Sequence, residues 1–477
     1  MKIKVIVAVD SKYGIGKNNS IPWNIPSDLK YFKEITTSSK KKNVLIMGRV
    51  TWDSIPEKFK PLSGRLNYII SSQDLDLKKY KNTLVFKSIK NAIKFSLMNC
   101  LAQNLGDIFI IGGSSIYTEV IKHIEINHLY LTRIYKDFNC DKKFMDKSFF
   151  ENNKFKNLHL IKVSNFQEEN GLHFRFFEYS KQDKLWESPE NQYLNLLKKI
   201  LDEGLERDDR TGTGTLALFG ERQEYNLEDT FPILTTKRIF IRAVFEELML
   251  YLRGETDNKI LNQKNIHIWD GNTSRNFLNS RGLTNYPEGD MGETYGFNFR
   301  HFGGEYINCE TKYDNCGFDQ VSNVINLIKN EPFSRRIIIS LWNPNTNHKA
   351  SLPSCLCWYQ FFVDTISKKL NLQIYIRSSD FFLANNWNIC TGALLVHMIC
   401  NLENIEYTPG KIICITGDTH IYKNHIEQAS INLERISTPF PKLIVKGKKN
   451  NVEEFTWEDF SLIGYEPQPN IKADISV

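Results

Sequence analysis

Short runs of β-branched and other apolar residues constrain the fold of the first half of this chain more than any other feature. Such runs cover residues 4–10, 43–47, 67–70, 107–111 and 129–133, and a helical pattern covers residues 89–101. Continuous apolar strands that alternate with helices are typical of a parallel sheet covered on both faces. The sequence therefore predicts an α/β fold with a doubly wound, mostly parallel sheet.

The end of this half has the pattern of an antiparallel hairpin. Two runs, residues 158–165 and 172–179, flank Glu169-Asn170-Gly171. Asn-Gly suits a tight turn because both central residues take positive φ. At 477 residues the chain exceeds one hydrophobic core. We expect a first domain over residues 1–180, a short polar junction over 181–190 and a second domain over 191–477.

The second half is organised around Cys355, which follows Pro353 and precedes an apolar, aromatic run that ends at Phe361. A strand is expected to begin there, and the next strand, residues 370–376, leads to Arg377. A hairpin turn at residues 364–369 would bring Arg377 beside Cys355, where a guanidinium favours the nucleophilic thiolate. From spacing alone, a nucleophile and a small buried apolar residue are equally open.

Further blocks decide between these interpretations. With Cys355, Asn388 and the segment 417–422 form a set that resembles thymidylate synthase, and the resemblance runs from about Gln192 to Val477. It implies an α+β domain that forms a homodimer and methylates dUMP with 5,10-methylenetetrahydrofolate, with Cys355 as the nucleophile. The other catalytic positions that it implies are Glu247, Tyr295, Asn388 and Asp380.

The same resemblance implies ligand-binding positions. Those for dUMP are Arg210, Arg335, Arg336, Arg377, Ser378, Ser379, Asp380, Asn388, His420 and Tyr422, and those for the folate are Trp269 and Asp380. In the family the paired arginines, which here precede a strand over 337–341, reach the nucleotide phosphate of the other subunit. Glu247 lies among apolar residues of a helix expected over 242–253, where an acid is either paired structurally or catalytic. The tail, residues 471–477, resembles the segment that closes over the site.

Three places depart from the family pattern. Leu356 stands where histidine is frequent, Ile376 replaces a common glutamine, and residues 384–387 replace a glycine-containing segment. These positions concern local hydrogen bonding to the nucleotide and leave the nucleophile unchanged. A pyrimidine nucleotide hydroxymethylase, which acts on a cytosine nucleotide, is the alternative for this half.

Near the N-terminus, Ile21-Pro22-Trp23 precedes Ser27, which we expect to cap a helix that carries Asp28 and, one turn later, Phe32. An acid in the first turn of a helix is favourable in any protein. Together, however, these residues resemble the pterin pocket of dihydrofolate reductase, whose carboxylate takes a two-pronged hydrogen bond from the pterin. The resemblance covers Met1 to about Ser180, and the folate-binding positions that it implies are Asp28, Phe32, Arg65, Ile111 and Thr132.

This second resemblance implies NADPH as the coenzyme. A glycine between a strand and a helix lets backbone N–H groups meet a phosphate, as at Gly48 and Gly112-Gly113. The dinucleotide fingerprint with three spaced glycines is absent. Ser115 stands where some members carry arginine. The implied coenzyme positions are Ala8, Ile15, Gly16, Gly48, Arg49, Thr51, Ser71, Gly112, Gly113, Ser114, Ser115, Ile116 and Tyr117. In series, the two halves resemble the bifunctional family in which both enzymes share one chain.

Composition bounds the remaining function classes. Residues 1–180 carry 29 Lys+Arg against 17 Asp+Glu, a net +12, and the remaining residues carry 32 against 38, a net −6. Nucleic-acid binding is the alternative for the basic half, but its scattered lysines favour a solvated surface.

The sequence contains no run of eighteen apolar residues, so it predicts no membrane span. The nine cysteines lack disulfide-framework or zinc spacing, so we expect no metal. Without a signal-peptide pattern, a cytoplasmic enzyme is expected.

Overall fold

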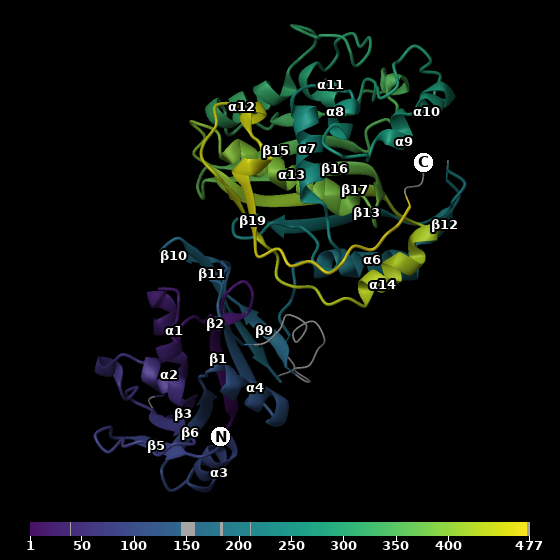
Figure 1. Cartoon of the computed structure of the whole chain (residues 1–477). Coiled ribbons are helices and arrows are strands. Elements are labelled where there is room, and N and C mark those ends of the chain that lie inside the picture. Colours follow the sequence, from purple (N-terminus) through teal and green to yellow (C-terminus); the bar gives the residue numbers. More distant parts are fainter. Residues whose placement is uncertain (39, 145–157, 182–184, 210, 475–477) are drawn as a thin grey trace. The chain divides into compact units, whose positions relative to one another are not determined.

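Two structural units divide the chain, Met1–Glu187 and Ser188–Val477. The computed structural model describes residues 1–38, 40–144, 158–181, 185–209 and 211–474. Each unit has its own hydrophobic core and its own sheet (Figure 1).

The first unit contains a nine-stranded sheet within the described residues, in the order β10-β11-β7-β1-β6-β3-β4-β5, with β9 also paired to β11. The strands from β7 to β5 in this order are parallel to their neighbours, whereas β11 is antiparallel to β7, β9 and β10. Their bounds are β1 Ile3–Val9, β3 Lys42–Gly48, β4 Leu66–Ile70, β5 Thr83–Phe86, β6 Leu105–Ile110, β7 His128–Ile134, β9 His159–Val163, β10 Gln167–Glu169 and β11 Leu172–Ser180. A separate pair joins β2 (Gly14–Gly16) to β8 (Lys142–Lys143).

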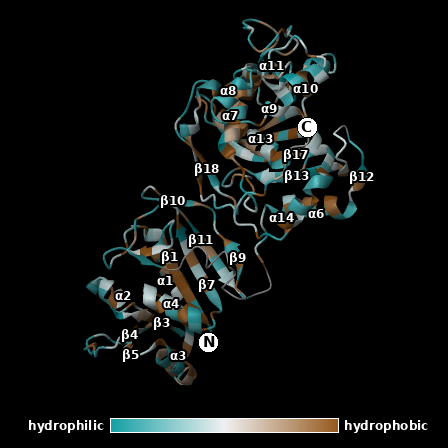
Figure 2. Ribbon diagram, turned by 45° about the vertical axis from the view of Figure 1, so that its right-hand side comes forward, coloured by the Kyte–Doolittle hydropathy of each residue, from teal (hydrophilic) through white to brown (hydrophobic). Residues whose placement is uncertain are grey.

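Helices cover both faces of this sheet. They are α1 Pro26–Thr36, α2 Arg49–Ser54, α3 Ile89–Met98 and α4 Ser114–His123, with a short 3-10 helix at Glu57–Phe59. Alternate residues of β3 separate the two faces: Val44 and Ile46 pack with α3 and α4, and Leu45 and Met47 pack with α1 and α2. All four side chains are fully buried, which explains the continuous apolar run. Figure 2 shows the hydrophobic residues concentrated on the central strands.

The predicted doubly wound, mostly parallel sheet is therefore confirmed. Asn170 and Gly171, with φ of 52° and 69°, form the turn between β10 and β11. The expected cap at Ser27 is wrong: α1 begins at Pro26, its N-cap residue is Ile25, and no side chain caps it. Proline suits the first helical position because its φ is already fixed there. Ser27 instead donates from its backbone N–H and its hydroxyl to the Glu169 carboxylate.

The second unit contains a six-stranded sheet within the described residues, in the order β12-β13-β17-β16-β15-β14, parallel only between β16 and β17. The bounds are β12 Leu205–Arg207, β13 Thr215–Asn226, β14 Ile338–Ser340, β15 Leu356–Asp364, β16 Lys369–Asp380 and β17 Thr408–Tyr422. A small two-stranded sheet joins β18 (Lys442–Val445) to β19 (Phe460–Ile463). The mixture of sheet and separate helices agrees with the expected α+β domain.

One face of this sheet is covered by helices. The helices are α6 Asn191–Glu203, α7 Ile241–Leu252, α8 Lys259–Asn262, α9 Asp270–Thr273, α10 Arg275–Ser280, α11 Tyr295–Arg300, α12 Gln320–Asn330, α13 Asn385–Cys400 and α14 Ile426–Leu433, with 3-10 turns η2 Asn347–Lys349, η3 Lys423–His425, η4 Val452–Glu454 and η5 Trp457–Asp459. α13 is buried along nearly its whole length and packs between the sheet and α7.

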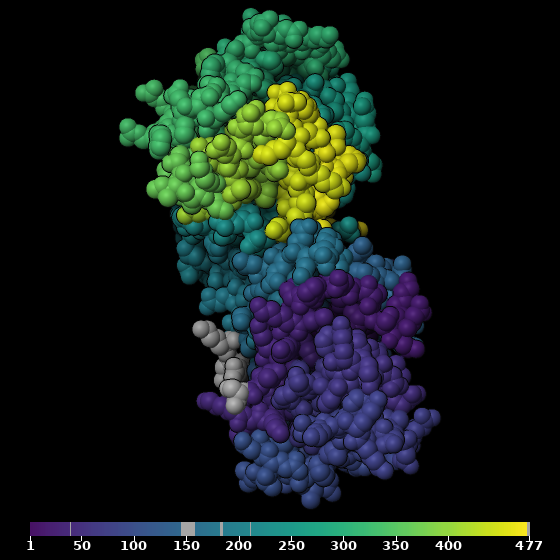
Figure 3. All heavy atoms as spheres, turned by 90° about the vertical axis from the view of Figure 1, so that its left-hand side faces the viewer, coloured from purple at the N-terminus to yellow at the C-terminus, as the bar shows by residue number. Residues whose placement is uncertain are grey.

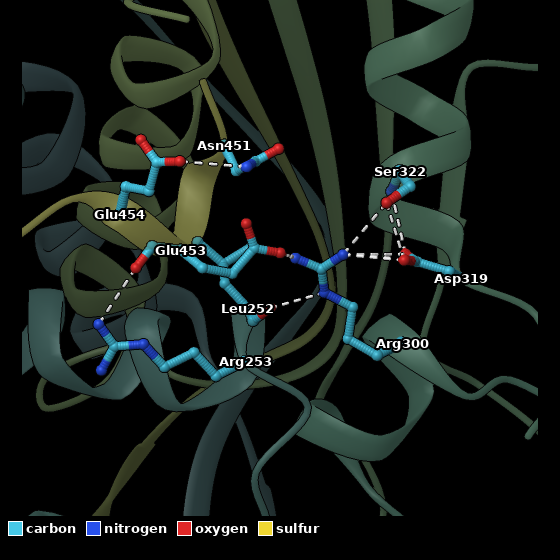
Figure 4. A network of polar contacts seen from close by, with 8 residues as sticks. All are labelled: Leu252, Arg253, Arg300, Asp319, Ser322, Asn451, Glu453 and Glu454. Carbon is cyan, nitrogen blue, oxygen red and sulfur yellow. Dashed lines mark hydrogen bonds and ion pairs between the residues drawn. The ribbon is translucent and has the colours of Figure 1, made fainter. Parts of the chain in front are cut away.

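The C-terminal residues lie on the surface of this unit against earlier segments, as the yellow patch in Figure 3 shows. Arg300, at the end of α11, connects several of these segments (Figure 4). Its guanidinium donates to the Leu252 carbonyl at 2.6 Å, pairs with Asp319 at 2.9 Å and forms an ion pair with Glu453. The end of α7, the start of α12 and the 3-10 turn η4 are thus held together by one largely buried side chain.

Candidate active sites

Cys355 lies at the entrance of β15, and its neighbour across the hairpin is Arg377 on β16. The Arg377 backbone N–H donates to the Cys355 carbonyl at 2.8 Å, and the guanidinium lies 4.0 Å from the Cys355 Sγ. The same guanidinium donates to the carbonyls of Ser354 at 3.0 Å and Pro353 at 2.9 Å. Arg377 therefore fixes the loop before the thiol and brings a positive charge to it.

Tyr295, at the start of α11, contacts the same loop from the other side. Its hydroxyl accepts hydrogen bonds from the backbone N–H groups of Cys355 at 2.8 Å and Leu356 at 3.4 Å. Its ring stacks on Tyr251 of α7, with 4.9 Å between ring centroids. α7 and α11 thereby position the backbone of the nucleophile candidate.

Glu247, on α7, is buried between two tryptophans. Its carboxylate accepts from the indole N–H of Trp269 at 2.8 Å and from that of Trp387 at 2.7 Å. Burial raises the pKa of Glu247, and these hydrogen bonds oppose the shift. Sequence analysis noted Trp387 only as part of a departure from the family pattern. A buried indole N–H requires an acceptor, which is the signal that could have linked it to the buried acid.

The other residues predicted to bind the nucleotide gather at one edge of the sheet. Parallel β16 and β17 end there together, with Ser378 opposite Asp418 and Asp380 opposite His420. His420 bonds through Nδ1 to Asp418 at 2.7 Å. The remaining members of this group, Ser379, Asn388 and Tyr422, lie at the same strand ends or in the first turn of α13.

The predicted arginine cluster is not assembled around Cys355 within the described residues. Arg335 and Arg336 are exposed and precede β14, which pairs with β15 so that Ile338 is opposite Gln360. Arg336 therefore lies near the end of β15 that is remote from Cys355, about 20 Å along the strand at 3.3 Å per residue. Arg210 lies outside the described residues.

In the first unit, Asp28 of α1 and Thr132 of β7 lie side by side. The Thr132 hydroxyl donates to the Asp28 carboxylate at 2.6 Å. Burial raises the pKa of Asp28 to about 6, and the bond from Thr132 opposes the shift. Phe32 follows one turn later on α1, and the Arg65 guanidinium lies 5.7 Å from the centre of its ring. Ile111 directly follows β6 and donates its backbone N–H to the carbonyl of Ile46 in β3.

The glycines predicted to bind a phosphate lie side by side. The Gly48 N–H donates to the Gly112 carbonyl at 2.7 Å, and a Cβ on Gly113 would lie 3.3 Å from the Thr51 hydroxyl. Gly112 has a φ of 115°, and a Cβ there would meet the Tyr117 ring at 3.2 Å. Neither α2 nor α4 has a side-chain cap. Glycine thus keeps two helix N-termini adjacent and open, which suits a phosphate-bearing ligand.

Around these glycines, the remaining predicted coenzyme positions differ in exposure. Arg49 pairs with Asp53 of its own helix at 2.9 Å, and Ser115 is exposed. Ser71 is buried and donates to the Gln73 carbonyl, and Ser114 donates to the Lys143 carbonyl. Ile116 packs against Gly48. Ala8 of β1 is opposite Thr132, and Ile15 and Gly16 lie in β2.

Sequence analysis overlooked Asp10, which directly follows β1 and is fully buried. Its carboxylate accepts from the N–H groups of Lys12 at 2.8 Å, Gly14 at 2.7 Å and Phe138 at 3.2 Å. It thus holds the loop that carries Ile15 and Gly16. An acid directly after a buried strand and before a glycine turn is the pattern that could have identified it.

Within the described residues, no group of His, Cys, Asp and Glu side chains is arranged to hold a metal ion. None of the helices in the described part of the chain is long and apolar enough to cross a membrane.

Comparison with known proteins finds two family models on this chain. The dihydrofolate reductase model matches residues 2–181, and the thymidylate synthase model matches residues 191–477. Similar proteins named bifunctional dihydrofolate reductase–thymidylate synthase occur in Paramecium tetraurelia (39% identical, covering 99% of this chain and 98% of the relative), Zea mays (37%, covering 99% and 96%) and Leishmania major (36%, covering 99% and 95%).

Proposed function

The chain belongs to the bifunctional dihydrofolate reductase–thymidylate synthases, and from this premise we propose which of its residues perform each reaction. The second half methylates dUMP to dTMP with 5,10-methylenetetrahydrofolate, which leaves dihydrofolate. The first half reduces dihydrofolate to tetrahydrofolate with NADPH. The comparisons support neither the hydroxymethylase nor the nucleic-acid-binding alternative.

For the synthase reaction, Cys355 is the nucleophile that adds to C6 of dUMP. The Arg377 guanidinium, 4.0 Å from its Sγ, favours the thiolate. Tyr295 holds the Cys355 backbone and thereby helps to keep the reacting sulfur in position. Glu247, between two indole N–H donors, orders the proton movements at the pyrimidine. The folate supplies the methylene group and the hydride that complete the new methyl group.

Asn388 and Asp380 complete the synthase site. An amide both accepts from uracil N3–H and donates to O4, which suits Asn388 to uracil. Asp380, His420, Tyr422, Ser378 and Ser379 line the same strand ends, and Trp269 borders the folate. Leu356 and Ile376 are fully buried. The polar side chains that are common at these positions in the family are therefore replaced by apolar ones in the core, and not on the surface that would contact the nucleotide.

For the reductase reaction, Asp28 binds the pterin, and Thr132 orients its carboxylate. A pKa of about 6 leaves Asp28 mostly ionised at neutral pH, as a charge-assisted bond to protonated pterin requires. Phe32, Ile111 and Arg65 complete the folate pocket.

The residues at the glycine pair fit NADPH. The two uncapped helix N-termini beside Gly48 and Gly112, where a Cβ would fill the cradle, offer N–H groups to its phosphates. Ser71 and Arg49 would hold the outer phosphate. When bound, NADPH supplies the hydride.

The synthase half forms a homodimer through the outer face of its sheet. Ile338, Trp358 and Phe362 lie on this face and are 38%, 38% and 67% exposed, whereas their neighbours Tyr359 and Phe361 point into the core. A contiguous exposed apolar face in a folded protein is typical of an interface. Arg335 and Arg336 lie beside this face, remote from Cys355 of their own chain, and would reach the phosphate of dUMP bound to the second copy.

Two further points belong to this proposal. The domains span residues 1–180 and 191–477 with a junction at 181–190, consistent with the two matched family models.

The enzyme acts in the cytoplasm, which agrees with nine cysteines that form no disulfide. Imaging of the tagged protein in its own cells tests the location.

The contact between Arg377 and Cys355, with Tyr295 on the Cys355 backbone, carries the functional assignment most directly. One spectrophotometric assay tests both halves. Purified protein given dUMP and methylenetetrahydrofolate should form dTMP and dihydrofolate. Addition of NADPH should then convert the dihydrofolate to tetrahydrofolate. Failure of either step would refute the corresponding assignment.

A further inference from the structure

Residues 291–295, here named the strap, run beside the loop that precedes Cys355. Ser351 donates its N–H to the Met291 carbonyl at 3.0 Å, and Glu293 donates its N–H to the Lys349 carbonyl at 3.2 Å. Between them, Gly292 has a φ of 77°, and a Cβ there would lie 2.3 Å from the Lys349 carbonyl oxygen. Only glycine permits so close an approach, so the two segments are held tightly together.

Contacts between the strap and the loop continue toward the nucleophile. The Thr294 hydroxyl lies 3.3 Å from the Leu352 carbonyl and 3.3 Å from the Ser354 hydroxyl. Tyr295 follows with its bond to the Cys355 N–H. Successive strap residues therefore contact successive loop residues, and a displacement at Lys349 would be passed along this contact to Cys355.

Glu293 is a buried acid whose role in this arrangement is unexplained by the reaction above. It is 2% exposed, and neither carboxylate oxygen makes a hydrogen bond of normal geometry within the described residues, although the Thr346 hydroxyl lies nearby. The nearest cation is the Lys349 ammonium at 3.8 Å. Burial raises the pKa of Glu293, while the Thr346 hydroxyl and the charges of Lys349 and His348 oppose the shift. Such burial is costly unless the charge is used.

We propose that Glu293 is a positioning residue for the synthase reaction: its ionised carboxylate holds Lys349, and thereby holds the loop that carries Cys355. The proposal rests on the proposed role of Cys355 as nucleophile. Lys349 is attached to the strap twice, by its carbonyl to the Glu293 N–H and by its ammonium to the Glu293 carboxylate. The second attachment exists only while the carboxylate is charged.

Other ionisable groups lie near the Glu293–Lys349 ion pair and influence its titration, but none of them takes the place of either partner. Asp290 and Tyr286 lie on the side of the strap, and the pKa of Tyr286 is raised first by burial and then by the negative charges of Asp290 and Glu293. His348 and Lys349 lie on the side of the loop. Because Lys349 favours the charged carboxylate, its removal must move the ionisation of Glu293 to higher pH.

The test uses the full chain and three variants, Glu293→Gln, Lys349→Met and the double variant, with the exposed Glu310→Gln as the matched control. The kcat/KM for dTMP formation is measured against pH. The rate at which iodoacetamide modifies Cys355, identified as the cysteine that dUMP protects, is measured alongside it. At neutral pH, Glu293→Gln should lower kcat/KM roughly 5- to 30-fold, the factor that 1–2 kcal/mol gives. It should also abolish the acidic limb that Glu293 contributes, and Lys349→Met should abolish the same limb, because no ammonium is then left for the carboxylate to hold.

Reductase activity of the same chain should be unchanged in every variant, and the double variant should be no worse than Glu293→Gln alone. A wild-type pH profile in Glu293→Gln, or strictly additive losses in the double variant, would overturn the proposal. If Glu293→Gln does not fold, an acidic limb in Lys349→Met that is the same as in wild type overturns it instead. Cys355→Ser distinguishes a failure of the Glu293 proposal from a failure of the proposed function. If that variant retains dTMP formation, the assignment of Cys355 as nucleophile fails, whatever the Glu293 variants do.

Discussion

The hydroxyl of Tyr295 accepts a hydrogen bond from the backbone N–H of Cys355 at 2.8 Å. The two residues are 60 positions apart in the chain, on α11 and at the entrance of β15. A phenol on a helix thus sets the backbone of the nucleophile on a strand.

Tyr295→Phe should therefore lower dTMP formation without preventing the fold. It leaves the Cys355 N–H without its acceptor, and an unsatisfied buried donor costs about 1–3 kcal/mol. The ring still stacks on Tyr251. The measurement is kcat for dTMP formation, with the reductase rate of the same chain as the control. An unchanged kcat would contradict the role of the Tyr295 hydroxyl in positioning Cys355.

Cys355→Ser should abolish dTMP formation and leave dihydrofolate reduction intact, because a serine hydroxyl without a strong base is a far weaker nucleophile. Cys357→Ser is the matched control. Its thiol is buried, and burial raises its pKa, so it is a poor nucleophile. Single-turnover assays of both variants check the prediction; turnover by Cys355→Ser well above background would contradict it.

Asp28→Asn should slow dihydrofolate reduction roughly 10- to 150-fold at neutral pH, since a hydrogen bond to a charged group is worth about 1.5–3 kcal/mol. The loss should shrink in acid, where dihydrofolate arrives protonated. The wild-type titration near the Asp28 pKa of about 6 should vanish from the pH–rate profile.

Thr132→Val provides the control for this titration. Its hydroxyl lowers the pKa of Asp28, so its removal should move the Asp28 titration to higher pH. Coincident pH profiles for wild type and both variants would exclude Asp28 from the reaction.

Local sequence rules predicted much of this fold correctly. The apolar run at residues 43–47 forms a strand buried on both faces, and Asn170-Gly171 forms the expected hairpin turn. The hairpin between β15 and β16 brings Arg377 to Cys355, as the turn at residues 364–369 predicted. These features depend on neighbours in sequence, which is why pattern alone predicts them.

Features that depend on distant partners were not predictable in the same way. Ser27 failed as a cap because Pro26 already starts the helix and Glu169, 142 residues away, takes its hydroxyl. The edge strand Thr83–Phe86 escaped notice because it is short and only partly buried. The pairing of Trp387 with Glu247 joins two helices through side chains alone, which no periodicity encodes.

Asn388→Asp should lose dUMP turnover and gain reaction with dCMP. Asn388 can donate its amide to O4 of uracil, whereas a carboxylate only accepts and matches the 4-amino group of cytosine. Its amide is held by the Ala384 carbonyl at 3.1 Å, which fixes its orientation. Competition between dUMP and dCMP measures the switch, and a wild-type enzyme that already prefers dCMP would favour a hydroxymethylase.

Glu247→Gln should reduce dTMP formation and change how stability depends on pH. The Glu247 carboxylate accepts from two indoles at once, but an amide has a single acceptor oxygen, so one indole N–H would face an NH2 group. That unmatched donor costs about 1–3 kcal/mol of unfolding free energy.

The sign of the pH effect follows from burial, which raises the folded-state pKa of Glu247 above its unfolded value. The folded protein then holds this proton more tightly, so the stability due to protonation is complete below the unfolded pKa and is lost as pH rises through the folded pKa. Glutamine cannot titrate. The deficit of Glu247→Gln relative to wild type should therefore be largest in acid and should shrink as pH rises.

Urea unfolding of the full chain at several pH values, followed by tryptophan fluorescence, measures this difference. Trp387→Phe is the control that keeps the acid, and it should keep the wild-type direction of the pH dependence. A deficit in Glu247→Gln that stays constant across pH would mean that Glu247 does not titrate in the folded protein over this range.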